Sequence, residues 1–184
     1  MQAEERSSHS VAKILRRAFG FSAFIGFGLS LIVHLLSFIG LNIMTYVPRI
    51  WVLHLGIFVF NLPLVFSPFN WSGKKEGLRR YFAPMPRWAR HVLHCFFAYA
   101  ILNFVIFIVL SHDGSPDILD GKYVLRTDGL PENQHVIREI SKEEYNLRSD
   151  RILRGFSGHW MLFYLVPAFY FWFPRMIREK PTNS

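Results

Sequence analysis

Cysteine is almost absent from this 184-residue sequence, which contains only Cys95. A single cysteine cannot form an intramolecular disulfide, a Cys-based zinc site or a redox pair of the Cys-x-x-Cys type. Cys95 lies inside a long apolar segment, where we interpret it as a small buried packing residue. These three kinds of cysteine site are therefore excluded.

Catalytic sequence motifs are missing as well. The sequence contains no Gly-x-Ser-x-Gly, no His-Glu-x-x-His, no phosphate-binding P-loop and no Gly-x-Gly-x-x-Gly after a predicted strand. The net charge of +8 is compatible with nucleic-acid binding, but no nucleic-acid-binding motif accompanies it. These absences favour a protein that is not an enzyme and does not bind nucleic acid.

Charged residues are missing from the cores of four apolar segments, at 18–45, 50–69, 89–111 and 156–173. The sequence is 51% hydrophobic and contains 19 Phe, and its charges are concentrated between these segments. A lipid bilayer imposes this segregation, because a helix of about 20 apolar residues spans its hydrocarbon core. We predict an all-α integral membrane protein with four transmembrane helices and a small extracytoplasmic loop that contains a β-hairpin and a helix.

The lengths of these segments predict further details. The first is too long for a secretory signal and is expected to be a retained span that tilts or projects. Pro63 and Pro68 are expected to kink or end the second span. The predicted segments, in order, are a cytoplasmic basic tail (1–17), three spans (18–111) with a cytoplasmic basic loop (70–88), an extracytoplasmic loop (112–155), a fourth span (156–174) and a cytoplasmic tail (175–184).

Basic residues beside the spans set the predicted orientation. Lysine and arginine cluster in both terminal tails and in the loop at 70–88, whereas the other side has Arg49 and a loop of mixed charge. Because such clusters mark the cytoplasmic side, both termini are expected there. The short loops and the compact arrangement of the predicted spans favour a location in a bacterial inner membrane. The tryptophans agree with these boundaries, since each falls at a predicted membrane interface: Trp51, Trp71, Trp88, Trp160 and Trp172.

The extracytoplasmic loop has its own predicted structure. Residues 122–126 and 135–140 indicate two short strands that pair as a hairpin. Ser141 and Glu144 have the spacing of a capping box, which predicts a helix through Ile152. A break in this helix is expected at Gly155 or Gly158. The loop is interpreted either as a docking surface for another protein or as a cap over the helix bundle.

Of the residue types Asp, Glu, Lys, Arg and His, only histidine lies in the cores of the predicted spans. His34, His54, His94 and His159 place one histidine in the interior of each span, and all but His94 lie in the outer half. Paired histidines from facing helices could bind haem, as in a membrane b-type cytochrome, with His34, His54 and His159 as candidate ligands. The same three residues are candidates for a metal site. The simpler interpretation, which we favour, is that each makes an interhelical hydrogen bond.

Small residues predict where the spans pack. Ser22, Gly26 and Ser30 recur every four residues in the first span, a spacing that lets two helices approach closely, and His34 continues this stripe. In the run from Arg154 to Trp160, two glycines could admit another backbone, but a flexible entry turn with an interfacial tryptophan is the favoured interpretation.

The sequence thus predicts a polytopic membrane protein that acts as a non-catalytic subunit or accessory factor. Its expected partners are the lipid bilayer and other membrane protein subunits or further copies of itself, bound through the spans and the outer loop. The alternative is a haem-binding redox protein of the membrane b-type cytochrome kind.

Overall fold

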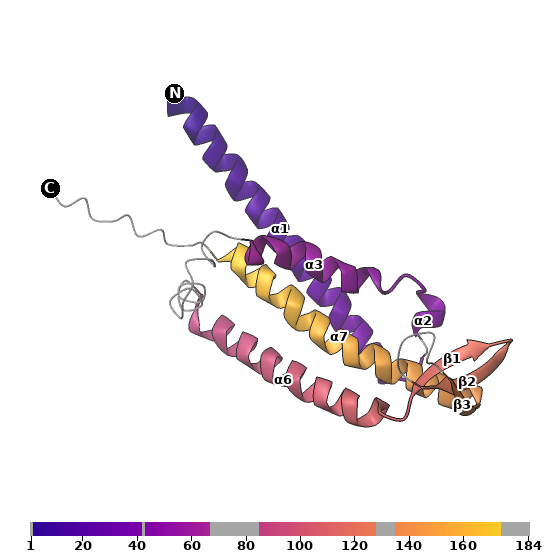
Figure 1. Cartoon of the computed structure of the whole chain (residues 1–184). Helices are drawn as coiled ribbons and strands as arrows, with labels where there is room; N and C mark the ends of the chain where they lie inside the picture. The colour runs from indigo at the N-terminus through magenta and orange to yellow at the C-terminus, as the bar shows by residue number, and fades with distance from the viewer. Residues whose placement is uncertain (1, 42, 67–84, 128–134, 174–184) are drawn as a thin grey trace.

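The computed structural model describes residues 2–41, 43–66, 85–127 and 135–173 (Figure 1). Most of these residues are helical, and a small sheet lies at one end of the helices, as the sequence predicts in outline. The predicted tail 175–184 and all but the last residues of the predicted loop 70–88 lie outside the described residues. The elements are α1 (Gln2–Leu36), α2 (Ile43–Tyr46), α3 (Val52–Val65), α6 (Arg87–Ser111), β1 (Ser115–Leu119), β2 (Lys122–Arg126), β3 (Val136–Glu139) and α7 (Lys142–Trp172).

Helix α7 is the central element of the bundle. It packs against α1, α3 and α6; α1 and α6 run opposite to α7, whereas α3 runs in the same direction (Figure 1). Its side chains dominate the core, with Leu153, Trp160 and Tyr164 almost fully buried. Since three helices cover its surface, α7 can carry more polar residues than a helix that faces lipid.

Two helices are long and apolar enough to cross a membrane, Lys13–Leu36 within α1 and Arg87–Ser111, which is α6. The described part of the predicted second span is α3, whose 14 residues extend for about 21 Å, less than the ~30 Å of a hydrocarbon core. The predicted fourth span is the carboxyl-terminal part of α7. The described residues therefore contain two candidate spans rather than the four predicted.

The first span differs from its predicted bounds at both ends. Residues of the predicted basic tail belong to α1, which begins at Gln2 and projects beyond the other helices (Figure 1). The helix ends at Leu36, before the predicted end at Thr45, and a turn follows. Gly40 in this turn has a φ of +75°, a left-handed conformation that side chains disfavour.

The sheet lies at the end of the bundle that we call outer, after the predicted orientation. It has three antiparallel strands in the order β1–β2–β3, whereas the sequence predicts two. The additional strand, β1, pairs along its whole length with β2. Asp120 and Gly121 connect them with φ values of +50° and +77°. Asp-Gly between two extended segments indicates a tight hairpin turn, so β1 could have been predicted from the sequence.

Helix α7 is continuous, although the sequence predicts a break at Gly155 or Gly158. Both glycines lie against α6 and leave room for its side chains. A Cβ atom on Gly155 would lie 2.5 Å from the Phe107 ring, and one on Gly158 would lie 2.2 Å from the Asn103 amide. The close-approach interpretation of this segment is therefore correct, and the entry turn that the sequence favoured is wrong. Trp160 is fully buried rather than interfacial.

Arginines from α1 and α7 bind the carboxyl-terminal ends of each other's helix. Arg16 of α1 donates from Nε to the Phe171 carbonyl of α7 at 2.9 Å, and its Nη2 donates to the Phe173 carbonyl. At the opposite end, Arg154 of α7 donates from Nη2 to the Ser37 carbonyl at 2.7 Å. Carbonyls at a helix end lack intrahelical partners and carry partial negative charge, so these contacts stabilise both ends and fix the register of the antiparallel pair.

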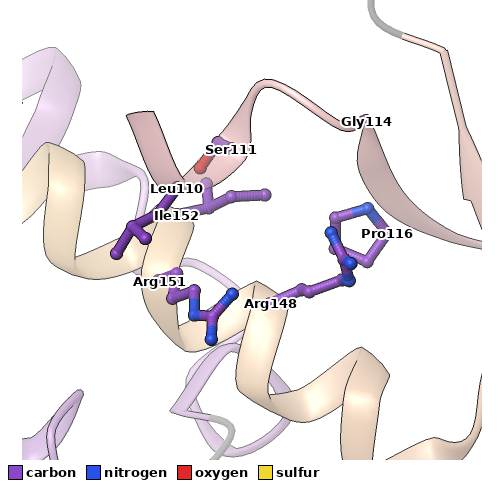
Figure 2. Close-up of a pocket in the computed structure, with 7 residues that line it drawn as sticks. All are labelled: Leu110, Ser111, Gly114, Pro116, Arg148, Arg151 and Ile152. Carbon is purple, nitrogen blue, oxygen red and sulfur yellow. The ribbon is translucent and has the colours of Figure 1, made fainter. Parts of the chain in front are cut away.

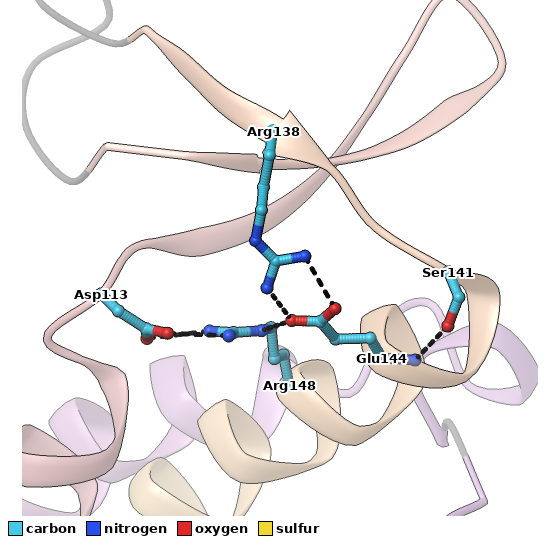
Figure 3. A network of polar contacts seen from close by, with 5 residues as sticks. All are labelled: Asp113, Arg138, Ser141, Glu144 and Arg148. Carbon is cyan, nitrogen blue, oxygen red and sulfur yellow. Dashed lines mark hydrogen bonds and ion pairs between the residues drawn. The ribbon is translucent and has the colours of Figure 1, made fainter.

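An ion-pair network fastens the sheet to α7 (Figure 3). Arg148 donates to both carboxylate oxygens of Asp113, at 2.8 and 2.7 Å, and to Glu144 at 2.8 Å. Glu144 also accepts two hydrogen bonds from Arg138 of β3. Ser141 caps α7 by accepting from the Glu144 N–H, as predicted, but the Glu144 side chain binds the arginines rather than completing a capping box.

Candidate functional site

His34 joins three helices in the outer half of the bundle. Its side chain is 3% exposed, and Nδ1 lies 2.8 Å from the Ser157 hydroxyl of α7. Nε2 is hydrogen-bonded to the Tyr99 hydroxyl of α6. A neutral imidazole has one donor and one acceptor nitrogen, so both are in use. A haem or metal ion could bind His34 only after one of these hydrogen bonds had broken.

His54 lies in an aromatic cluster between α3 and α7. Its Nδ1 accepts a hydrogen bond of 2.9 Å from Nε1 of Trp160, which places the ring proton of a neutral imidazole on Nε2. The ring packs edge-on against Trp51 and Phe156. Trp160, which the sequence assigns to the interface, is the buried centre of this contact.

The remaining histidines bind their own helices. His159 donates from Nδ1 to the Gly155 carbonyl at 2.8 Å and packs against Phe104 of α6. His94 is exposed and donates to the Arg90 carbonyl. Within the described residues, no three His, Cys, Asp or Glu side chains gather in a potential metal site. His34, His54 and His159 thus belong to separate contacts.

The small-residue stripe of α1 lies against Tyr164. Gly26 and Ser30 are buried, whereas Ser22 is exposed and lies off the contact. The Tyr164 ring fills the space beside Gly26 and beside Gly56 of α3, and its hydroxyl donates to the Leu53 carbonyl at 2.8 Å. Two glycines on different helices thus leave the space that the Tyr164 side chain occupies. Cys95 is exposed on α6, because it faces away from α7, and is not the buried residue predicted.

Arg154 of α7 extends the contacts of His34 toward the outer end, and Asp150 lies one turn before it on the same helix. Arg154 binds the Ser37 carbonyl and lies 4.0 Å over the Phe38 ring. Ser37 in turn donates to the His34 carbonyl at 2.6 Å. We call this group the outer polar cluster; its members are His34, Ser37, Tyr99, Asp150, Arg154 and Ser157.

The buried charges of the outer polar cluster were missed by the sequence reasoning, which placed them in an outer-loop helix. Asp150 is 1% exposed, and burial raises the pKa of its carboxyl to about 6. The sequence does contain one indication that these residues act together. Asp150, Arg154 and Ser157 have the i, i+4, i+7 spacing of one helix face. That face could be recognised as buried only once α1 and α2 were seen to cover it.

The chemistry available to the outer polar cluster is hydrogen bonding and proton exchange within the protein. Ser157 and His34 have the distance of a nucleophile and its base, yet Ser157 is fully buried and its hydroxyl also donates to the Arg154 carbonyl. A small pocket lies elsewhere, where α6 ends beside α7 (Figure 2). It is lined by Leu110, Ser111, Gly114, Pro116, Arg148, Arg151 and Ile152.

Comparison with known proteins adds no family to these observations. No protein-family model, no curated protein and no solved structure matches the chain.

Proposed function

We propose that the protein is a non-catalytic membrane subunit or accessory factor that binds another membrane protein through its outer sheet and its spans. In this proposal the chain crosses a bacterial inner membrane four times and keeps both termini in the cytoplasm. The observation that carries the proposal is a set of exposed apolar side chains on the sheet, beyond the end of the candidate span α6.

The exposed apolar side chains lie on the two edge strands of the sheet. Ile118 and Leu119 of β1 are 51% and 43% exposed, and Val136 and Ile137 of β3 are 46% and 49% exposed. Apolar area left in water costs about 25 cal/mol per Å², and an unpaired edge strand offers backbone groups to another chain. A partner protein that covers these strands would remove both sources of instability.

The surface of α6 supports a location in the membrane. Most of its circumference exposes large apolar side chains, including Phe97, Ile101 and Val105. Such a surface is stable in lipid, and a helix of a partner can replace lipid on it. In chain order, the directions of α1, α3, α6 and α7 alternate, which agrees with four crossings, and its neighbours shield α7 from lipid (Figure 1).

The contacts of the histidines favour this function over the haem alternative. His34 and His54 already hold protein groups, and each joins two or more helices. Interhelical hydrogen bonds of this kind stabilise a bundle without any cofactor.

Site-specific photocrosslinking in growing cells tests the proposal. A photoreactive phenylalanine analogue would replace Ile118 or Ile137 in turn, and Glu143, exposed on the first turn of α7, would serve as the control position. We expect one discrete adduct at both sheet positions and none at the control. The partner would be identified by mass spectrometry, and Ile137→Asp should abolish the Ile118 adduct while leaving the protein folded in the membrane.

Two results would contradict the proposal. The first is the absence of any adduct at either sheet position in cells that express the protein at its normal level. The second is an equal spread of adducts over the sheet positions and Glu143, which would indicate random collision.

A further inference from the structure

Asp150 has an unusual environment for a carboxylate. The side chain is 1% exposed, and neither of its oxygens has a hydrogen-bond partner in the described structure. The Ile43 N–H of α2 lies near the carboxylate without completing a hydrogen bond. Removing an ionised carboxylate from water without pairing it is strongly unfavourable, so this arrangement suits a neutral, protonated Asp150.

A charged partner for Asp150, the guanidinium of Arg154, lies one helical turn away on α7 but contacts other groups. Arg154 donates from Nη2 to the Ser37 carbonyl at 2.7 Å and lies over the Phe38 ring, while its Nε is buried and has no partner. An aspartate four residues before an arginine has the favourable spacing for an ion pair on a helix. The same guanidinium can therefore serve either the end of α1 or Asp150.

We propose that Asp150 and Arg154 form a proton-controlled switch, in which Arg154 caps α1 at Ser37 when Asp150 is neutral and turns to Asp150 when the carboxylate ionises. In the second position the Ser37 carbonyl loses its charged partner, and the contact that holds the turn after α1 is released. The described residues that follow, 37–41 and helix α2, then separate from α7. The described structure is the capped state.

The pH at which the switch operates follows from burial. Desolvation raises the pKa of Asp150 to about 6, while the nearby charge of Arg154 and the Ile43 N–H lower it, so the transition is centred near pH 6. Other groups close enough to the pair to act on its charges are Arg151 on α7, Tyr99 on α6 and His34 on α1. Arg151 stays protonated and Tyr99 stays neutral in this range. The third neighbour, His34, is controlled by substitution.

Thiol accessibility of α2 measures the position of the segment. Met44→Cys would be introduced in a Cys95→Ala background and labelled in nanodiscs with an impermeant maleimide between about pH 5 and 7.5. The rate is divided by that of Glu143→Cys, an exposed site, which cancels the pH dependence of the thiol itself. We expect the normalised rate to rise several-fold across this range, and to do so also when His34 is replaced by Gln.

Substitutions at Asp150 and Arg154 distinguish the proposed switch from a general loosening of the fold. Asp150→Asn cannot ionise and should keep the low rate at every pH, whereas Arg154→Gln should show a high rate at every pH. Asp120→Asn, at an exposed turn, should behave as the parent protein. A normalised rate in the parent that is the same at all pH values would overturn the proposal, as would a pH-dependent rate in Asp150→Asn.

Thermal unfolding provides an independent measurement. A folded-state pKa raised above the unfolded value of ~3.9 means that the bound proton stabilises the fold, and that this contribution is lost as pH rises toward 6. The melting temperature of Asp150→Asn should thus equal that of the parent at about pH 4 and exceed it at about pH 7.5. A lower melting temperature for Asp150→Asn at both pH values would show that the carboxylate is a structural group rather than a switch.

Discussion

At the scale of single residues, the bundle depends on a few side chains that fill the space left by glycines. Tyr164 is the clearest case, because its ring lies against Gly26 of α1 and its hydroxyl against Gly56 of α3. Phe107 and Asn103 of α6 occupy the corresponding spaces beside two glycines of α7. Close approach of two helices therefore requires small residues at specific positions rather than a high overall content of small residues.

Gly26→Leu should lower stability much more than Gly28→Leu. A Cβ atom at Gly26 would lie 2.4 Å from the Tyr164 ring, whereas nothing lies within 4 Å of one at Gly28. Overpacking of this kind costs about 1–3 kcal/mol. Thermal unfolding in detergent would measure the difference, and equal losses for the two variants would show that Tyr164 does not lie in this contact.

His34→Ala tests the role of the central histidine. The variant loses hydrogen bonds to Ser157 and Tyr99, and averages for interhelical bonds in membranes give about 0.6 kcal/mol for each. A total loss of about 1 kcal/mol is expected, with almost none for the exposed His94→Ala. Absorption spectra of the purified proteins provide the second measurement, because a Soret band that disappears in His34→Ala would establish the haem alternative.

At the scale of elements, charged side chains fix how helices end and how the sheet is attached. The mutual arginine contacts of α1 and α7 set the register of these two helices. The ion pairs around Arg148 connect the end of α6, strand β3 and the start of α7 (Figure 3). The arginine–carbonyl contacts and the ion pairs both lie at the ends of the bundle, where water screens the charges incompletely.

Arg16→Gln should loosen the carboxyl-terminal end of α7. The variant loses charged hydrogen bonds to two helix-end carbonyls, which together with the helix dipole contribute about 1–2 kcal/mol. Hydrogen exchange of the Phe169–Phe173 amides should accelerate. Arg17→Gln is the matched control, since Arg17 is exposed and makes none of these contacts. Similar exchange in both variants would contradict the cap.

The ion-pair network should weaken in acid. Hydrogen bonds from Arg148 hold the pKa of Asp113 at about 2, and those from Arg138 and Arg148 hold the pKa of Glu144 at about 2. Because both folded-state pKa values are depressed, their stabilisation is present above the unfolded values near 4 and is lost as pH falls from about 4 to 2.

The measurement is a comparison of melting temperatures. Arg148→Gln should melt below the parent protein at about pH 7, and the difference should shrink as pH falls to about 2. Arg151→Gln is the control, because Arg151 makes no ion pair with the described residues. A difference for Arg148→Gln that is independent of pH would contradict the network as the cause.

At the scale of the whole molecule, the orientation in the membrane remains a prediction from basic residues. In a Cys95→Ala background, an impermeant maleimide applied to intact cells should label Glu143→Cys and leave Lys13→Cys unlabelled until the membrane is permeabilised. Labelling of Lys13→Cys but not Glu143→Cys in intact cells would reverse the orientation. Labelling of both before permeabilisation would exclude an odd number of crossings between them.

The sequence by itself determined the helical class, the end of α6 at Ser111 and the cap at Ser141, because these depend on local apolar runs and on the chemistry of a few neighbouring residues. It also identified Gly26 and His34 as residues that face the bundle. Local patterns of this kind persist whatever the helices pack against.

The tertiary structure alone decided which polar residues became buried. Asp150 and Arg154 lie in a charged stretch that any local rule places in water, yet the turn after α1 and helix α2 cover them. Trp160 has the sequence position of an interfacial tryptophan, but α3 and its His54 enclose it. The physical reason is that burial is a property of what neighbouring helices cover, and those contacts join residues more than a hundred positions apart.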